Sequence, residues 1–72
     1  MAIRGGSNYA LAYYEMGQYS LAIQDLVRTT ILDPTNAEAY SWKGNAYYAL
    51  DQKREGDAAW ATACGLNSRY CK

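Results

Sequence analysis

Apolar residues recur at helical spacing along four stretches of the chain. In the first stretch, Tyr9, Ala12, Tyr13 and Met16 stand three or four residues apart, which places them on one face of a helix. The same spacing continues further along, so we predict helices over residues 8–16, about 21–32, 37–50 and 54–66. No stretch shows the apolar–polar alternation of a half-buried strand. The pattern therefore predicts an all-α fold.

Residues that stop or start helices separate these stretches. Gly17 directly follows the first, as glycine often does at a helix C-terminus. Pro34 cannot continue a helix, so it divides the second stretch from the third. Thr35 is a favourable N-cap for the third helix, and Glu38 three residues later completes a capping box. Asn36 is an alternative cap, which leaves the start of this helix open by one residue.

The two halves of the chain resemble each other at a spacing of 34 residues. Six pairs are identical at this spacing: Ser7 and Ser41, Ala12 and Ala46, Tyr13 and Tyr47, Tyr14 and Tyr48, Gln18 and Gln52, Leu32 and Leu66. A fixed period of this kind is typical of repeat proteins, in which each unit is one supersecondary structure. Each unit here contains two predicted helices, so the chain contains two copies of a helix–turn–helix.

Each copy also carries a motif of aromatic and small residues. In the second copy the motif residues are Tyr40, Gly44, Tyr47, Gly56 and Trp60. In the first copy they are Tyr9, Ala10, Tyr13, Ala22, Leu26 and Pro34. This 34-residue pattern resembles the tetratricopeptide repeat (TPR). The chain departs from the pattern at Gly6, Lys43, Asp51 and Ser68, and Lys43 stands where the pattern has Leu.

The resemblance implies two helix–turn–helix units stacked as a short right-handed superhelical array. The expected division is a flexible N-terminus over 1–6, repeat 1 over 7–35, repeat 2 over 36–68 and a tail over 69–72. Small residues paired between the two helices of each unit would let the helices approach closely, with larger side chains alongside. The residues that we expect to be buried are Tyr9, Ala10, Tyr13, Ala22, Leu26, Tyr40, Gly44, Tyr47, Trp60 and Ala63.

Composition argues against several classes of protein. The 72 residues include 7 basic and 7 acidic side chains, so no net positive charge attracts nucleic acid or anionic lipid. RNA-binding helical repeats have a similar period but need basic grooves, which argues against that class as well. Without any His, neither a Ser–His nor a Cys–His catalytic pair is present. We predict no enzyme, no cofactor and no metal site, and no membrane span because polar residues interrupt every apolar run.

The two cysteines, Cys64 and Cys71, provide too few ligands for a zinc site. Small secreted proteins usually carry more disulfides than two cysteines allow. We therefore interpret both residues as free thiols in a reducing compartment, with Cys64 buried, and we expect a cytoplasmic location.

The resemblance also implies a groove lined by the first helix of each repeat, which would hold an extended peptide or a partner helix. The groove residues carried over by position are Arg4, Ser7, Leu11, Tyr14, Glu15, Glu38, Ser41, Asn45, Tyr48 and Ala49. The candidates for peptide binding are Leu11, Tyr14, Ser41, Asn45 and Tyr48. Two interpretations of Tyr14 and Tyr48 stay open: an aromatic ladder along the groove, or surface tyrosines that cover the helix pair.

The function that these features indicate is a protein-interaction module. The alternative is a structural fragment or capping part of a longer scaffold or multidomain protein, with no ligand of its own. One subset of TPR domains clamps the C-terminal carboxylate of chaperones with Lys, Asn and Arg. Ser7, Leu11 and Trp42 stand where that subset carries Lys and Asn, so binding of that type is not expected.

The fourth helix differs from the second in a way that predicts the end of the array. At the 34-residue spacing, Tyr19, Ile23 and Ile31 are replaced by Lys53, Asp57 and Gly65. End repeats need a polar outer face, so we interpret these changes as capping, with ordinary drift between repeats as the alternative. We expect a mainly monomeric chain with weak self-association through the apolar groups left at this end, Trp60, Cys64 and Leu66.

Overall fold

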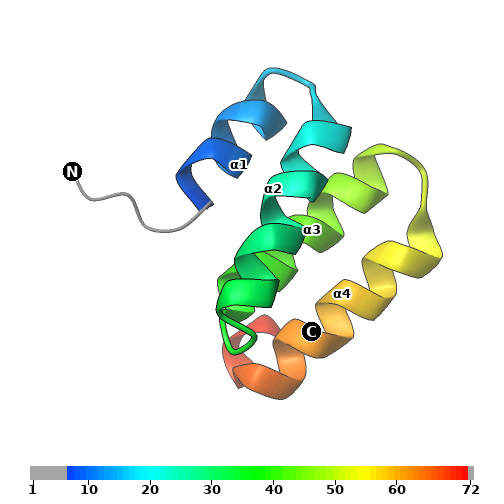
Figure 1. Cartoon of the computed structure of the whole chain (residues 1–72). Helices are drawn as coiled ribbons and strands as arrows, with labels where there is room; N and C mark the ends of the chain where they lie inside the picture. The colour runs from blue at the N-terminus through cyan, green and yellow to red at the C-terminus, as the bar shows by residue number, and fades with distance from the viewer. Residues whose placement is uncertain (1–6, 72) are drawn as a thin grey trace.

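The computed structural model describes the backbone of residues 7–71 and the side chains of residues 10–71 (Figure 1). It contains four helices, α1 (Ser7–Glu15), α2 (Tyr19–Leu32), α3 (Ala37–Ala49) and α4 (Lys53–Leu66), followed by a 3₁₀ turn, η1 (Ser68–Tyr70). The described part has no strand, so the all-α prediction is confirmed. The predictions for residues 1–6, and those for the side chains of Ser7 and Tyr9, lie outside the described part.

The helices form two hairpins stacked side by side. Consecutive helices run antiparallel, and each packs against the next along the chain (Figure 1). The first helix of the second hairpin, α3, packs against both α2 and α4 and also touches α1. This arrangement confirms the predicted stacking of two helix–turn–helix units.

Small side chains occupy the positions where the helices approach most closely. Ala10, Leu26 and Ala39 form a buried cluster, and burial is also confirmed for Ala22, Gly44 and Ala63. The predicted burial of Tyr13, Tyr40, Tyr47 and Trp60 is only partial, because the smaller residues occupy the closest helix contacts. The core is therefore built mostly from alanine and glycine, with aromatic rings at its border.

The crossing of α3 and α4 depends on two glycines. A Cβ added to Gly44 would overlap the indole ring of Trp60 and lie 3.1 Å from the backbone oxygen of Gly56. A Cβ added to Gly56 would lie 2.6 Å from the ring of Tyr48 and 3.1 Å from the backbone oxygen of Gly44. Glycine at both positions thus allows the two backbones to approach, and the rings of Tyr48 and Trp60 close the crossing from its two sides.

The turns inside the two repeats share one backbone conformation. Gly17 has φ +79° and its counterpart Asp51 has φ +64°, both in the left-handed region. The Gly17 N–H donates to the carbonyl of Tyr14 at 3.0 Å, and the Asp51 N–H donates to the carbonyl of Tyr48 at 2.9 Å. A residue with a Cβ is strained in this region, whereas glycine is not. The departure from the repeat pattern at Asp51 therefore carries a conformational cost.

Asp51→Gly is expected to raise the free energy of unfolding by about 0.5–1 kcal/mol, because it removes this strain. The matched control is Gly17→Asp, which should lower the free energy by a similar amount. Urea denaturation followed by helical circular dichroism measures both variants. A lower midpoint for Asp51→Gly than for the parent would contradict the assignment of strain to this turn.

The N-cap of α3 is Asn36, not Thr35. The side-chain oxygen of Asn36 accepts a hydrogen bond from the Ala39 N–H at 3.1 Å. The Thr35 hydroxyl instead donates to the carboxylate of Asp33 at 3.0 Å, within the turn around Pro34. The predicted Thr35 capping box is therefore wrong and the alternative cap is confirmed, because the turn already engages the threonine hydroxyl.

The C-terminal segment folds back onto α4, contrary to the predicted polar tail. Cys64 and Cys71 form a disulfide with Cα atoms 4.5 Å apart, and the ring centroids of Tyr70 and Trp60 are 6.1 Å apart. Two residues seven apart in one helix would lie about 10 Å apart along its axis. The helix ends at Leu66. The side chain of the next residue, Asn67, accepts from the Arg69 N–H at 3.1 Å, and this turn brings the cysteines together. The prediction of free thiols is wrong, and with it the argument for a reducing compartment is lost.

The three replaced positions on α4, Lys53, Asp57 and Gly65, are exposed, as a polar end requires. Whether they terminate the array stays a prediction.

Within the described residues, no helix combines the length and the apolar character that crossing a membrane requires.

Candidate functional site

Tyr14 lies at the junction between the two repeats. Its ring makes edge contacts with Tyr19 of α2 at 5.2 Å and with Trp42 of α3 at 5.4 Å between centroids. The ring is partly buried, because the first helix of the next repeat stands beside it. This geometry fits a tyrosine that covers the helix pair and still presents one edge outward.

Tyr48, the counterpart of Tyr14, has a different environment. Its hydroxyl donates to the carboxylate of Asp57 on α4 at 2.5 Å, and its ring lies against Gly56. The hydrogen bond to the carboxylate raises the pKa of the Tyr48 hydroxyl above its usual value. No helix follows η1 in the described chain to take the place that α3 takes beside Tyr14. Tyr48 therefore contacts the second helix of its own repeat, and the two tyrosines are not equivalent.

The remaining candidates differ in how accessible they are. Ser41 is only 5% exposed, and its hydroxyl donates to the Glu38 carbonyl at 2.7 Å, so it has little to offer a ligand. Leu11 and Asn45 are partly exposed, and the Asn45 amide makes no hydrogen bond to another described residue. Of the other groove positions, Glu15, Glu38 and Ala49 are exposed, while the side chains of Arg4 and Ser7 lie outside the described part.

The sequence-based prediction did not include Trp42 among the candidate binding residues. Trp42 packs against the cluster of Ala10, Leu26 and Ala39 and meets Tyr14 across the repeat junction. It lies three residues before Asn45, on the same stripe of α3. This three-residue spacing could have indicated from the sequence that Trp42 shares a face of the helix with Asn45. We use the name inner surface for four residues: Leu11 and Tyr14 of α1, and Trp42 and Asn45 of α3.

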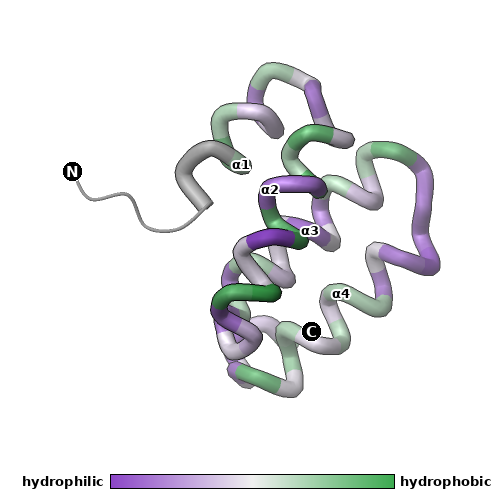
Figure 2. Tube along the Cα trace, viewed as in Figure 1, coloured by the Kyte–Doolittle hydropathy of each residue, from purple (hydrophilic) through white to green (hydrophobic). Residues whose placement is uncertain are grey.

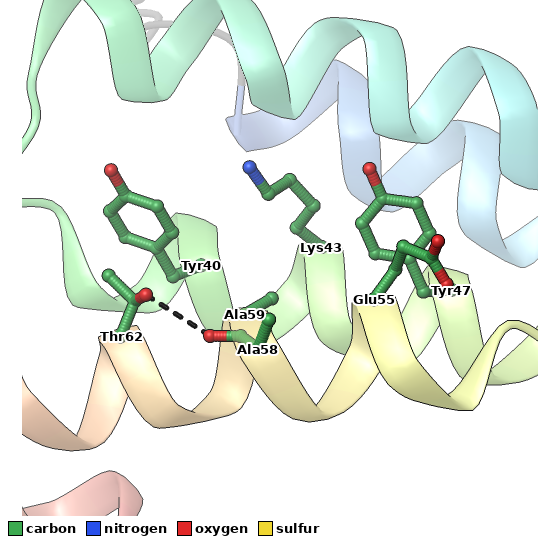
Figure 3. Close-up of a pocket in the computed structure, with 7 residues that line it drawn as sticks. All are labelled: Tyr40, Lys43, Tyr47, Glu55, Ala58, Ala59 and Thr62. Atoms are coloured by element: carbon green, nitrogen blue, oxygen red, sulfur yellow. Dashed lines mark hydrogen bonds between the residues drawn. The ribbon is translucent and has the colours of Figure 1, made fainter.

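A separate hollow of about 220 Å³ lies between α3 and α4. Tyr40, Lys43 and Tyr47 line it from α3, and Glu55, Ala58, Ala59 and Thr62 line it from α4. Figure 3 shows the hydroxyls of both tyrosines and the ammonium of Lys43 projecting in the same direction from α3. The Lys43 ammonium is 5.1 Å from the centroid of the Tyr40 ring. Burial lowers the pKa of Lys43 from its usual value.

The family described as TPR repeat matches residues 10–51, which is more than half of the chain. The matched part runs from α1 through the turn that follows α3. The chain therefore belongs to the tetratricopeptide repeat family, whose repeats are typically non-catalytic modules for protein interaction. No curated protein matches the chain.

Proposed function

We propose that this chain is a protein-interaction module that binds an extended peptide or a partner helix on the inner surface. The observation that carries the proposal is the contact between Tyr14 and Trp42, next to an Asn45 amide that no other described residue engages. Two aromatic rings from different repeats and a free amide stand on one side of the molecule. The rings can provide contact area for a bound segment, and the amide can fix the orientation of that segment through a hydrogen bond.

Each inner-surface residue has a defined role in this proposal. Tyr14 and Trp42 are held by packing on two helices, so a ligand gains aromatic contact without ordering them first. Tyr and Trp are enriched among the residues that dominate binding energy at protein interfaces. The Asn45 amide can donate to and accept from the backbone of an extended segment. Leu11 extends the apolar contact along α1.

One observation favours the alternative role, in which the chain is part of a longer scaffold. The C-terminal end of α2 is strongly hydrophobic, in contrast to the hydrophilic turn between α3 and α4 (Figure 2). Ile31 and Leu32 at this end are nevertheless 72% and 76% exposed. Exposed apolar side chains of this size are typical of surfaces covered in an assembly.

The cytoplasmic location and the mainly monomeric state both stay predictions.

Asn45→Ala tests the proposed function. A peptide selected from a random library for binding to the parent chain supplies the ligand, and isothermal titration measures its affinity. We expect a loss of about 0.5–1.5 kcal/mol, because one hydrogen bond to the peptide is removed.

The matched control is Gln24→Ala, which removes an exposed amide from α2, away from the inner surface. We expect it to leave the affinity of the peptide unchanged. An equal loss in the two variants, or a loss in Gln24→Ala alone, would place the peptide elsewhere on the molecule.

A further inference from the structure

Lys43 lies on the opposite side of α3 from the inner surface. Successive residues of a helix are about 100° apart, so Lys43 points about 200° away from Asn45. Tyr40 and Tyr47, which flank Lys43 in the hollow between α3 and α4, share its side of the helix. The hollow is therefore a second feature of the chain, independent of the proposed peptide-binding surface.

The size of the hollow limits what it can hold. Sites for small molecules and cofactors usually enclose about 300–1,000 Å³. The hollow measures about 220 Å³ and is open to solvent, so it suits one side chain of a partner better than a free metabolite.

The chemistry of the hollow favours an anion. Within residues 10–71, the contact of the Lys43 ammonium is the ring of Tyr40, and no carboxylate forms an ion pair with it. The hydroxyls of Tyr40 and Tyr47 project from α3 in the same direction as the ammonium, one on each side of it, and each can donate a hydrogen bond. Glu55 is the one acidic residue lining the hollow, and it stands on α4 with an exposed side chain.

Packing alone does not account for a lysine at this position. The repeat pattern has Leu here, and a Leu would fill the hollow with apolar atoms. Burial instead lowers the pKa of Lys43, which means that the fold disfavours its charged form. A residue that breaks a packing rule is often found at a functional site.

We propose that the hollow between α3 and α4 binds the carboxylate of an Asp or Glu side chain on a partner protein. Lys43 provides the charged contact, and a hydroxyl from one of the two flanking tyrosines, Tyr40 or Tyr47, donates a hydrogen bond to a carboxylate oxygen. Hydrogen bonds between charged groups are about twice as strong as neutral ones. The occupied hollow would thus give the partly buried ammonium the acidic partner that the described residues do not supply.

The first experiment uses acetyl-Glu-amide as the probe and acetyl-Gln-amide as its uncharged match, each titrated into ¹⁵N-labelled protein. We expect the Glu probe to shift the backbone amides of Tyr40, Lys43 and Tyr47 with a Kd on the order of 1–10 mM. The Gln probe should bind at least ~10-fold more weakly. Equal shifts with both probes, or no shift at these amides with the Glu probe at ~50 mM, would overturn the proposal.

Lys43→Leu separates binding from packing. This variant should lose the response to the Glu probe, weakening its binding at least ~10-fold, yet keep the parent's thermal stability or exceed it. The control Lys53→Leu removes an exposed lysine from the start of α4 and should change the affinity less than ~2-fold. Glu55→Gln should tighten binding of the Glu probe about 2–5-fold, because it removes a like charge from the hollow. Retained binding in Lys43→Leu, or an equal loss in Lys53→Leu, would contradict the proposed site.

Discussion

Gly44→Val is expected to lower the free energy of unfolding by about 3 kcal/mol. The new side chain would overlap the indole of Trp60 and press on the backbone oxygen of Gly56. The indole could move, but the backbone of α4 can move only by opening the helix crossing. A domain of this size is stabilised by roughly 0.05–0.15 kcal/mol per residue, so the change removes a large part of its stability.

The matched control for this variant is Gly65→Ala. Gly65 is also a helical glycine, but a Cβ added there meets no atom within 4 Å. We expect alanine at this position to stabilise α4 by about 0.5 kcal/mol, through helix propensity alone. Urea denaturation of both variants measures the contrast. Similar effects of the two substitutions would mean that the close crossing of α3 and α4 does not limit the side chain at Gly44.

Trp60→Ala is expected to cost about 3 kcal/mol, at the lower end of the range for large aromatic truncations because the ring is partly exposed. The indole closes the crossing at Gly44 and contacts the ring of Tyr70. Its loss therefore leaves the space beside Gly44 unfilled and removes one ring contact of Tyr70. The melting temperature should fall by about 10–20 °C. Trp60→Phe keeps an aromatic ring and should cost less than ~1.5 kcal/mol. A melting temperature for Trp60→Ala within a few degrees of the parent would show that Trp60 is not part of the core.

The repeat itself explains why the fold was predictable from the sequence. Residues at a spacing of 34 occupy the same structural positions, down to the left-handed backbone shared by Gly17 and Asp51. A period in the sequence therefore shows which residues have equivalent positions in the two repeats. The details of one turn depend instead on which of several nearby groups a side chain bonds. The hydroxyl of Thr35 could cap α3 or bond Asp33, and the sequence does not say which partner it takes.

The disulfide was not predictable from spacing alone. Cys64 and Cys71 come together only because α4 ends at Leu66 and the chain turns back through η1. A prediction that treats the residues after the helix as an unstructured tail places the two sulfurs far apart. The predicted end of this helix agrees with the structure, so what the prediction lacked was the turn after it, which brings Cys71 back to Cys64.

Whether the candidate residues bind a ligand stays a prediction. Leu11 and Asn45, carried over from the repeat pattern, are partly exposed, but the pattern does not say which positions neighbouring helices cover. Ser41 is buried for this reason, and Trp42 was overlooked although it shares a stripe with Asn45. The hydroxyl of Tyr48 donates to Asp57 of α4, a contact between helices that the pattern of one helix does not specify.

The central claim is that a protein ligand binds on the inner surface, and chemical-shift mapping tests it most directly. The library-selected peptide is titrated into ¹⁵N-labelled chain, and the shift of every assigned backbone amide is recorded. We expect the largest shifts at Leu11, Tyr14, Trp42 and Asn45, with little change along the exposed side of α2 at Gln24 and Arg28. Shifts concentrated on that side of α2, with the amides of the inner surface unchanged, would contradict the claim.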